Sequence, residues 1–283
     1  MKANKINKIS IIGAGRLGLS IAKGLVASGQ YKPEDIILNR RNIKAINEFN
    51  TKGFKIESNQ KLAIEKSDLI IVSVGPKDIK SIFNNDTNIK LNSSQTLIST
   101  VAGVSIDNIE EEYKKYNEKI NFSIFRVMPN IAIAICESMT CIAMKSHTDN
   151  NDYQRDLNNR REIVNIFSKL GMTKVLNEDL MEAATALCGS GLAFFLRSIR
   201  AAAHGGTEIG FHADEALELA AQTARGAASL VNNSNDHPEL QIDKVTTPKG
   251  ITISGLNEMD HSGFSSAMIH AIVKSAEKLN KIK

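Results

Sequence analysis

A glycine-rich segment near the amino end of the chain is the strongest indication of chemistry. It reads Gly-Ala-Gly-Arg-Leu-Gly, follows the apolar run Ile9–Ile12 and precedes a helical pattern over Leu19–Ala27. In such a strand, turn and helix, Gly13 permits a tight turn, Gly15 lets a diphosphate approach the backbone, and Gly18 lets helix and strand pack closely. The helix start offers unpaired N–H groups to the anion. A chance glycine-rich turn is the alternative. The predicted dinucleotide-binding residues are Gly13, Gly15, Arg16, Leu17 and Gly18.

The residues after the second apolar run indicate which dinucleotide is bound. An NAD site usually carries Asp or Glu there, which accepts hydrogen bonds from the ribose hydroxyls. This chain has Asn39, Arg40 and Arg41 instead. A carboxylate would repel a 2′-phosphate, whereas an amide beside two guanidinium groups offers charge-assisted contacts to it. The pattern favours NADP(H), with NAD(H) left open. Alternatively, the two arginines form only the solvated start of a helix.

Other reactive side chains show no comparable pattern. Cys136, Cys141 and Cys188 lack the spacing of redox or zinc motifs, so buried and inert thiols are expected. The six histidines show no metal-binding spacing, and no metal is predicted. The segment around Ser190 lacks the G-x-S-x-G motif and stands between helical patterns, which disfavours acyl transfer.

Two kinds of structure must position these residues. From Ile9 to about Met144, short β-branched runs alternate with helical patterns, which is typical of βαβ units and a parallel sheet. A polar stretch from residue 150 leads into another surface helix, predicted to end at Gly171. The expected strands are Ile9–Ile12, Ile36–Leu38, Leu69–Val74, Leu97–Val101, Phe122–Val127 and Met139–Met144.

After Leu176 the chain becomes alanine-rich, over Asp179–Ala203 and Ala213–Val231, with turn-like glycines at 205, 206 and 210. The predicted fold class is α/β: an N-terminal Rossmann-type parallel sheet domain over residues 1–176, followed by an all-helical domain over residues 177–283. Apolar residues cover more than one stripe of the second segment, so burial against another subunit is expected. We predict a homodimer with intertwined helical domains, or a higher oligomer; a monomeric bundle is the alternative.

The bulk composition agrees with a two-domain globular enzyme. The chain has 283 residues, of which 42% are hydrophobic and 23% charged. No apolar run approaches the roughly 18–20 residues that a bilayer requires. The basic start, Met1–Lys5, is not followed by the apolar core of a signal peptide, so a cytoplasmic protein is expected. The net charge of +4 is spread along the chain, which suits a small anionic ligand better than nucleic acid.

Over nearly its whole length the sequence resembles pyrroline-5-carboxylate reductase. Besides the glycine segment and Asn39-Arg40, the similarity includes residues 72–76, 99–103, 126–130 (Arg-Val-Met-Pro-Asn), 189–191 (Gly-Ser-Gly) and 244–252. The resemblance implies NADPH-dependent reduction of 1-pyrroline-5-carboxylate to L-proline, the last step of proline biosynthesis, in a pocket shared between subunits at the helical domain. It also implies that the cofactor's ribose and nicotinamide are bordered by Val74, Gly75, Pro76, Ala102, Gly103, Met128 and Asn130.

The resemblance places the substrate site on the loop Thr247–Thr252. The family usually reads S-P-G-G-x-T there, with backbone N–H groups and the final threonine holding the substrate carboxylate. Lys249 replaces a glycine. If the backbone needs a positive φ at this position, a lysine there would be strained. The ammonium of Lys249 either adds positive charge to the anion site or is solvated. Leu192, Phe194, Arg200 and Ile131-Ala132 also depart from the family pattern. The expected substrate-binding residues are Thr247, Lys249, Gly250, Ile251, Thr252, Gly189 and Ser190.

The implied reaction moves a hydride to the C=N carbon of a cyclic imino acid. A protonated imine is already electrophilic, so catalysis can rest on holding that carbon about 3–3.5 Å from the donor. Thr252 is the expected catalytic residue, orienting the imine and supplying a proton; a helix-capping hydroxyl is the alternative.

Gly189 and Gly191 either allow close approach of a ligand or serve helix packing. A reductase of another imine or keto acid, and a dinucleotide-binding sensor without turnover, remain alternatives.

Overall fold

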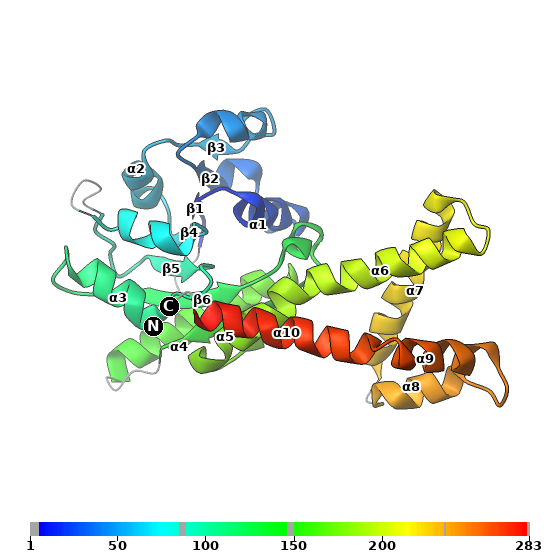
Figure 1. Cartoon of the computed structure of the whole chain (residues 1–283). Coiled ribbons are helices and arrows are strands. Elements are labelled where there is room, and N and C mark those ends of the chain that lie inside the picture. Colours follow the sequence, from blue (N-terminus) through cyan, green and yellow to red (C-terminus); the bar gives the residue numbers. More distant parts are fainter. Residues whose placement is uncertain (1–5, 85–88, 146–149, 235, 282–283) are drawn as a thin grey trace. The chain divides into compact units, whose positions relative to one another are not determined.

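The computed structural model describes residues 6–84, 89–145, 150–234 and 236–281 (Figure 1). The basic amino-terminal residues Met1–Lys5 therefore lie outside the described residues. The chain divides into two compact units, which we describe separately. The first comprises Met1–Gly189 with Ala276–Lys283, and the second Ser190–Ser275.

Within the described residues, the first unit is built on a single sheet of eight strands. Their order across the sheet is β3-β2-β1-β4-β5-β6-β7-β8. Strands β1 to β6 are parallel to one another, β7 is antiparallel to β6, and β8 is parallel to β7. The predicted fold class, a Rossmann-type sheet followed by helices, is confirmed. The strands are β1 (Ile9–Ile12), β2 (Ile36–Asn39), β3 (Lys55–Ile56), β4 (Leu69–Val72), β5 (Thr96–Ser99), β6 (Ser123–Met128), β7 (Ser138–Met144) and β8 (Gly171–Val175).

Helices cover both faces of this sheet because strand side chains point alternately to opposite sides. Ile11 belongs to the apolar cluster that contains Ile21 of α1 and Phe167 of α4. The next residue, Ile12, belongs to a second cluster, which contains Ile109 of α3. The helical segments of this unit are α1 (Arg16–Ala27), η1 (Pro33–Asp35), η2 (Ile43–Phe49), α2 (Gln60–Glu65), η3 (Pro76–Ser81), α3 (Ile106–Lys114), η4 (Ile131–Ile135), α4 (Asn150–Ser168), η5 (Glu178–Leu180), α5 (Met181–Ala184) and the π-helical turn η6 (Thr185–Ser190).

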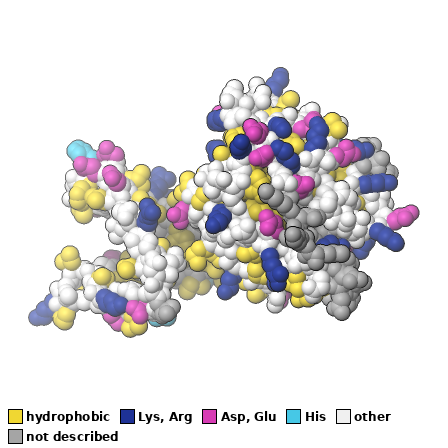
Figure 2. All heavy atoms as spheres, turned by 180° about the vertical axis from the view of Figure 1, so that it is seen from behind, with side chains coloured by type: hydrophobic (Ala, Val, Ile, Leu, Met, Phe, Trp, Pro, Cys, Tyr) yellow, Lys and Arg dark blue, Asp and Glu magenta, His cyan; other side chains and the backbone are white. Residues whose placement is uncertain are grey.

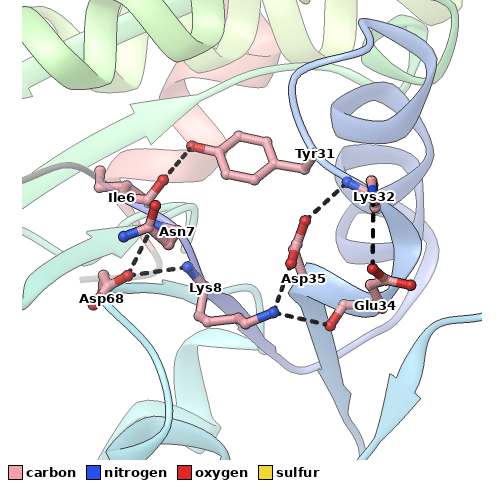
Figure 3. A network of polar contacts seen from close by, with 8 residues as sticks. All are labelled: Ile6, Asn7, Lys8, Tyr31, Lys32, Glu34, Asp35 and Asp68. Carbon is pink, nitrogen blue, oxygen red and sulfur yellow. Dashed lines mark hydrogen bonds and ion pairs between the residues drawn. The ribbon is translucent and has the colours of Figure 1, made fainter.

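A polar network fixes the amino ends of three neighbouring strands (Figure 3). Asp68, just before β4, accepts hydrogen bonds from the backbone N–H groups of Asn7 (2.8 Å) and Lys8 (3.0 Å), just before β1. The Lys8 ammonium lies 2.6 Å from the carboxylate of Asp35, just before β2. Tyr31 donates a hydrogen bond of 3.3 Å to the backbone oxygen of Ile6. These contacts hold β1, β2 and β4 together at the edge of the sheet opposite to the glycine segment.

Several details differ from the sequence-based expectation. Strand β4 ends at Val72 and β5 at Ser99, two residues earlier than expected in each case, so the following residues belong to loops at the carboxyl edge. Strands β3 and β8 were not predicted, and β7 runs antiparallel.

Gly171 was expected to end a helix, but it begins β8 with φ +131°, where a Cβ would lie 2.2 Å from the oxygen of Ser138. The close pairing of β7 and β8 therefore requires a glycine.

The second unit is entirely helical within its described residues. Its helices are α6 (Gly191–Glu208), α7 (Ala213–Asn233), α8 (Pro238–Val245), α9 (Ile251–His261) and most of α10 (Phe264–Asn280). Gly205 and Gly206 were expected to form a turn, but both lie inside α6, and the turn falls at Gly210 with φ +118°. A Cβ on Gly206 would lie 3.1 Å from Cβ of Ala216 in α7. This glycine thus serves the close packing of α6 on α7.

Much of the apolar surface of the second unit is exposed, as the yellow side chains in Figure 2 show. Only a few of its residues, such as Ala203 and Ala216, are buried. By length and composition alone, the helical stretch Glu178–Glu208 could cross a membrane: its most apolar window of 18 residues has a mean hydropathy of 1.3, and 28% of that window is buried. Large exposed side chains on α6 and α7 include Phe195, Leu196, Leu217, Leu219, Leu230 and Val231.

Candidate cofactor and substrate sites

The glycine loop lies at the carboxyl end of β1 and is held by its neighbours. The backbone oxygen of Asn39 accepts hydrogen bonds from the N–H groups of Gly13 (3.0 Å) and Ala14 (2.9 Å). Gly13 has φ +89°, and a Cβ there would lie 2.5 Å from the backbone oxygen of Ser73. The turn therefore requires glycine for both its backbone conformation and its contact with the loop after β4.

The start of α1 is open to an anion. The helix begins at Arg16, and its cap residue, Gly15, has no side chain to accept hydrogen bonds from the first amides. A Cβ on Gly15 would have a single neighbour within 4 Å, at 3.9 Å, so space remains above this backbone. At Gly18, by contrast, a Cβ would lie 2.9 Å from the oxygen of Gly13. These three environments match the roles that the sequence predicts for the glycines, and the site fits a diphosphate.

The loop after β2 holds its polar residues in three different ways. Asn39 is buried, and its amide group donates hydrogen bonds to the backbone oxygens of Glu57 (2.7 Å) and Ser58 (3.1 Å), so its N–H donors are already used. Arg40 reaches towards the glycine loop, 3.5 Å from the oxygen of Ala14. Arg41 is exposed and forms an ion pair with Asp78. Of the three predicted side chains, the two arginines are therefore the ones available to a phosphate.

Neither arginine starts a helix. The following segment η2 begins at Ile43, with Asn42 as its cap residue. The alternative that Arg40 and Arg41 form the solvated start of a helix is therefore wrong.

The remaining predicted cofactor residues follow β4, β5 and β6 at the same edge. The strand ends lie in register, with Ile12 paired to Asn39 and to Val72, and Val72 paired to Ser99. Parallel strands therefore bring their following loops together at the usual place for a nucleotide. Pro76 and Gly103 also border a cavity of about 710 Å³, whose other lining residues lie mainly in η3 and α3. The predicted residues placed at this edge are Val74, Gly75, Pro76, Ala102, Gly103, Met128, which ends β6, and Asn130.

Asn130 connects this edge to the turn η6. Its backbone N–H donates to Ser138 Oγ (3.1 Å), its side-chain oxygen accepts from Ala132 (3.0 Å), and its side-chain amide donates to the backbone oxygen of Cys188 (3.0 Å). Gly189 and Ser190 follow directly in η6. A Cβ on Gly189 would lie 3.8 Å from the nearest atom, so packing within the chain does not require a glycine there.

A buried charge cluster supports β6, and our sequence analysis missed it. The side chain of Arg126 is 1% exposed, and its Nη1 atom lies 3.5 Å from Glu182 and 3.6 Å from Glu178. Glu178 also accepts a 2.6 Å hydrogen bond from the backbone of Ile106 at the start of α3. An arginine inside an otherwise apolar strand was the available signal, because a buried charge needs a partner.

Two of the three cysteines form an interacting pair. Cys141 of β7 is buried and Cys188 of η6 is half-buried, and both belong to the same apolar cluster. A hydrogen bond from the Cys141 thiol lowers the pKa of Cys188 to about 7, and the same contact, with burial, raises the pKa of Cys141. The expectation of three buried thiols is therefore wrong for Cys136 and Cys188, which are only partly buried, and the contact with Cys141 favours a thiolate at Cys188 over an inert thiol.

The loop Thr247–Thr252 belongs to the second unit and is a tight turn followed by a helix. The N–H group of Gly250 donates a 2.9 Å hydrogen bond to the oxygen of Thr247. Lys249 has φ +60°, and with Pro248 before it this is the pattern of a type II turn. Lysine therefore occupies a backbone conformation that favours glycine. A Cβ on Gly250 would lie 2.4 Å from Thr247 Oγ1, so this glycine is required.

Thr252 lies inside the first turn of α9. The helix begins at Ile251 and its cap residue is Gly250. The alternative role of Thr252 as the helix cap is therefore wrong. Ile251 is 92% exposed. The structure thus brings the predicted cofactor residues together in the first unit and the predicted carboxylate-binding residues together in one loop of the second.

Comparison with known protein families gives two matches. Residues 8–103 match a family model described as NADP oxidoreductase, coenzyme F420-dependent. Residues 178–282 match the model for pyrroline-5-carboxylate reductase dimerisation. Within the described residues, no group of three or more His, Cys, Asp or Glu side chains is arranged to hold a metal ion.

Curated relatives match almost the whole chain. Pyrroline-5-carboxylate reductase 2 of Dictyostelium discoideum is 43% identical over 99% of this chain and 94% of its own length. Pyrroline-5-carboxylate reductase 1 of the same organism is 44% identical over 96% of this chain, which spans about half of that relative (49%). The Arabidopsis thaliana pyrroline-5-carboxylate reductase is 31% identical, with 97% and 95% coverage.

Solved structures show the same fold. The Plasmodium falciparum pyrroline carboxylate reductase, crystallised with NADP, has a TM-score of 0.82 at 24% identity and covers 100% of this chain and 99% of its own. The Streptococcus pyogenes 1-pyrroline-5-carboxylate reductase has a TM-score of 0.80 at 25% identity, with 98% and 99% coverage.

Proposed function

The chain belongs to the pyrroline-5-carboxylate reductase family, and on that basis we propose that it reduces 1-pyrroline-5-carboxylate to L-proline with NADPH. The observation that carries this proposal is the match, over nearly both full lengths, to reductases of that name. The glycine loop and the carboxylate loop supply the two binding functions that this reaction needs.

The first unit would hold NADP(H). The uncapped amides at the start of α1 and the open backbone at Gly15 fit the diphosphate, and Arg40 and Arg41 supply the positive charge for a 2′-phosphate. The loops after β4, β5 and β6 border the remainder of the cofactor. When bound, the reduced nicotinamide supplies the hydride.

The loop Thr247–Thr252 would hold the substrate. The turn leaves the first amides of α9 without side-chain partners, and a helix start favours a carboxylate. From the family pattern we also assign substrate binding to Gly189 and Ser190 of η6. Lys249 would add a positive charge to the carboxylate site.

The chemistry needs one hydride and one proton. The hydride forms a C–H bond at the imine carbon while the C=N π electrons move to nitrogen, and the proton on nitrogen completes the amine. The hydroxyl of Thr252 would orient the imine and, directly or through water, relay a proton from solvent to its nitrogen before the hydride is transferred. No stronger acid is required, because the protonated imine is already electrophilic.

The exposed apolar helices indicate an oligomer. Side chains on α6 and α7 that are about half exposed in the single chain would become buried between subunits, and the dimerisation match covers both helices. We propose a homodimer with intertwined helical domains in the cytoplasm. We also propose that the functional division lies at residue 176, because the dimerisation match starts at residue 178.

A substrate comparison tests the function. The purified protein is incubated with NADPH and 1-pyrroline-5-carboxylate, and NADPH oxidation and proline formation are both measured, then repeated with NADH and with open-chain keto acids. We expect proline to form in proportion to NADPH consumed, far faster than any keto acid is reduced. Comparable rates with keto acids would indicate another reductase, and NADPH binding without proline formation would indicate a sensor.

A further inference from the structure

Arg41 and Asp78 connect two loops on either side of the glycine loop. Arg41 follows β2 and Asp78 lies in η3, which follows β4, and both strands pair with β1. The Arg41 guanidinium forms an ion pair with the Asp78 carboxylate across 37 residues of sequence. The pair therefore lies at the edge of the sheet where the adenosine half of a dinucleotide binds in this fold.

Asp78 is the less exposed member of this pair, and its backbone is held by the loop after β4. The backbone N–H of Asp78 donates to the oxygen of Gly75 (2.9 Å), and a Cβ on Gly75 would lie 3.2 Å from Asp78 Oδ2. Its carboxylate therefore lies against the loop predicted to border the cofactor. The Arg41 side chain is 79% exposed, compared with 40% for Asp78. Exposed ion pairs of this kind contribute little to stability, so the long arginine side chain can leave its partner at small cost.

The other two polar side chains of this loop have neutral partners within the chain. The amide donors of Asn39 are used by Glu57 and Ser58, and Arg40 is directed to the glycine loop. Arg41 is thus the more exposed of the two arginines assigned to the 2′-phosphate, and the described structure gives it one acidic partner, Asp78.

We propose that Asp78 is a cofactor-specificity residue, which competes with the adenosine 2′-phosphate for Arg41 and so keeps NADH usable. This inference rests on the proposed cofactor site. A phosphate monoester carries close to two negative charges at neutral pH, so a neighbouring carboxylate opposes it and must give up its guanidinium. NADH has a hydroxyl at that position, which can donate a hydrogen bond to a carboxylate. Asp78 therefore lowers the preference for NADPH that Arg41 creates.

The test is a binding measurement on the full-length protein. Dissociation constants for NADPH and NADH are measured by titration calorimetry for the wild type, Asp78→Asn, Asp78→Ser and Arg41→Ala, and for Arg41→Ala combined with Asp78→Asn. Glu34→Gln, which removes an exposed acid at the opposite edge of the sheet, is the control for net charge.

We expect Asp78→Asn and Asp78→Ser to tighten NADPH binding by about five- to tenfold and to leave NADH unchanged or weaker. The tighter NADPH binding should disappear when Asp78→Asn is combined with Arg41→Ala. Glu34→Gln should leave the dissociation constants for both nucleotides unchanged. Equal changes for both nucleotides, or weaker NADPH binding, would overturn the role of Asp78 while leaving the proposed reductase intact. If the wild type binds neither nucleotide, the proposed function and this inference both fail.

Discussion

Gly24 of α1 lies directly against Ile133 of η4: a Cβ on Gly24 would be 2.2 Å from the backbone oxygen of Ile133. The helix that starts at the glycine loop therefore packs, without an intervening side chain, on the segment that follows Met128–Asn130. This contact joins two predicted parts of the cofactor site, the diphosphate loop and the loop after β6. The position of each depends on the other.

Gly24→Ala should disturb both loops. We expect the free energy of unfolding to fall by about 1–3 kcal/mol, because helix and η4 must move apart to admit the methyl group. The dissociation constant for NADPH should rise as well. Ser20→Ala, in the same helix, is the control and should change both quantities little. Chemical denaturation and nucleotide titration of the two variants measure the effects. An equal response of the two variants would show that the close contact is unimportant.

Tyr31 should make stability depend on alkaline pH. Burial, with the nearby carboxylates of Glu162, Asp68 and Asp35, raises the pKa of Tyr31 from 10.0 to about 12; Figure 3 shows Tyr31, Asp35 and Asp68. Between these values the unfolded chain releases a proton that the folded chain retains, so folding stability falls as pH rises from about 10 to 12. Below pH 10 the stabilisation is fully present.

Tyr31→Phe removes that titrating group. The variant should lose stability less steeply than the wild type over the same pH interval in parallel denaturation series. Identical slopes for the two proteins would refute the raised pKa of Tyr31. A constant offset at lower pH reports only the lost hydrogen bond to Ile6.

Cys188 should be the thiol most readily alkylated near neutral pH. Its pKa is lowered to about 7 by the hydrogen bond from Cys141, so the reactive thiolate should form around that pH. Mass spectrometry of iodoacetamide-treated protein over a pH series measures the labelling of each cysteine. Cys141→Ala should move the labelling of Cys188 to higher pH. Half-labelling of Cys188 near pH 9 in both proteins would contradict the prediction.

Thr252→Ala should impair turnover more than folding. Because the hydroxyl is proposed to orient the imine and supply its proton, kcat should fall by about 100-fold. Thr252 does not cap α9, so the melting temperature should stay close to the wild-type value. Ser254→Ala, two residues further along the same helix, is the matched control and should retain activity. If Thr252→Ala leaves both kcat and KM unchanged, the catalytic role is wrong.

Local patterns were sufficient to predict most of the fold. The alternation of β-branched runs and helical patterns identified β1, β2 and β4 to β7, and the glycine spacing identified the cofactor loop. Strand β3 has only two residues and β8 contains exposed Met172, so neither produces a clear apolar run. The antiparallel direction of β7 follows from its short connection to β6, since a parallel crossover needs a dozen or more residues.

Contacts between distant residues could not be predicted in the same way. The partners of Arg126 lie more than fifty residues further along the chain, and the thiol pair of Cys141 and Cys188 depends on the packing of β7 against η6. The side chain of Asn39 was expected to face the cofactor, but its amide is fixed by the loop after β3, which no local pattern predicts. Such contacts between distant residues can be identified only from the three-dimensional structure.

The most direct test of the proposed reduction is to follow the hydride from NADPH to the product. The protein is incubated with 1-pyrroline-5-carboxylate and NADPH carrying deuterium at the transferable position of its nicotinamide, and the product is analysed by mass spectrometry and NMR. Direct hydride transfer predicts proline with one deuterium on the ring carbon that was the imine carbon. Proline without deuterium, or deuterated NADPH left unconsumed beside intact substrate, would contradict it.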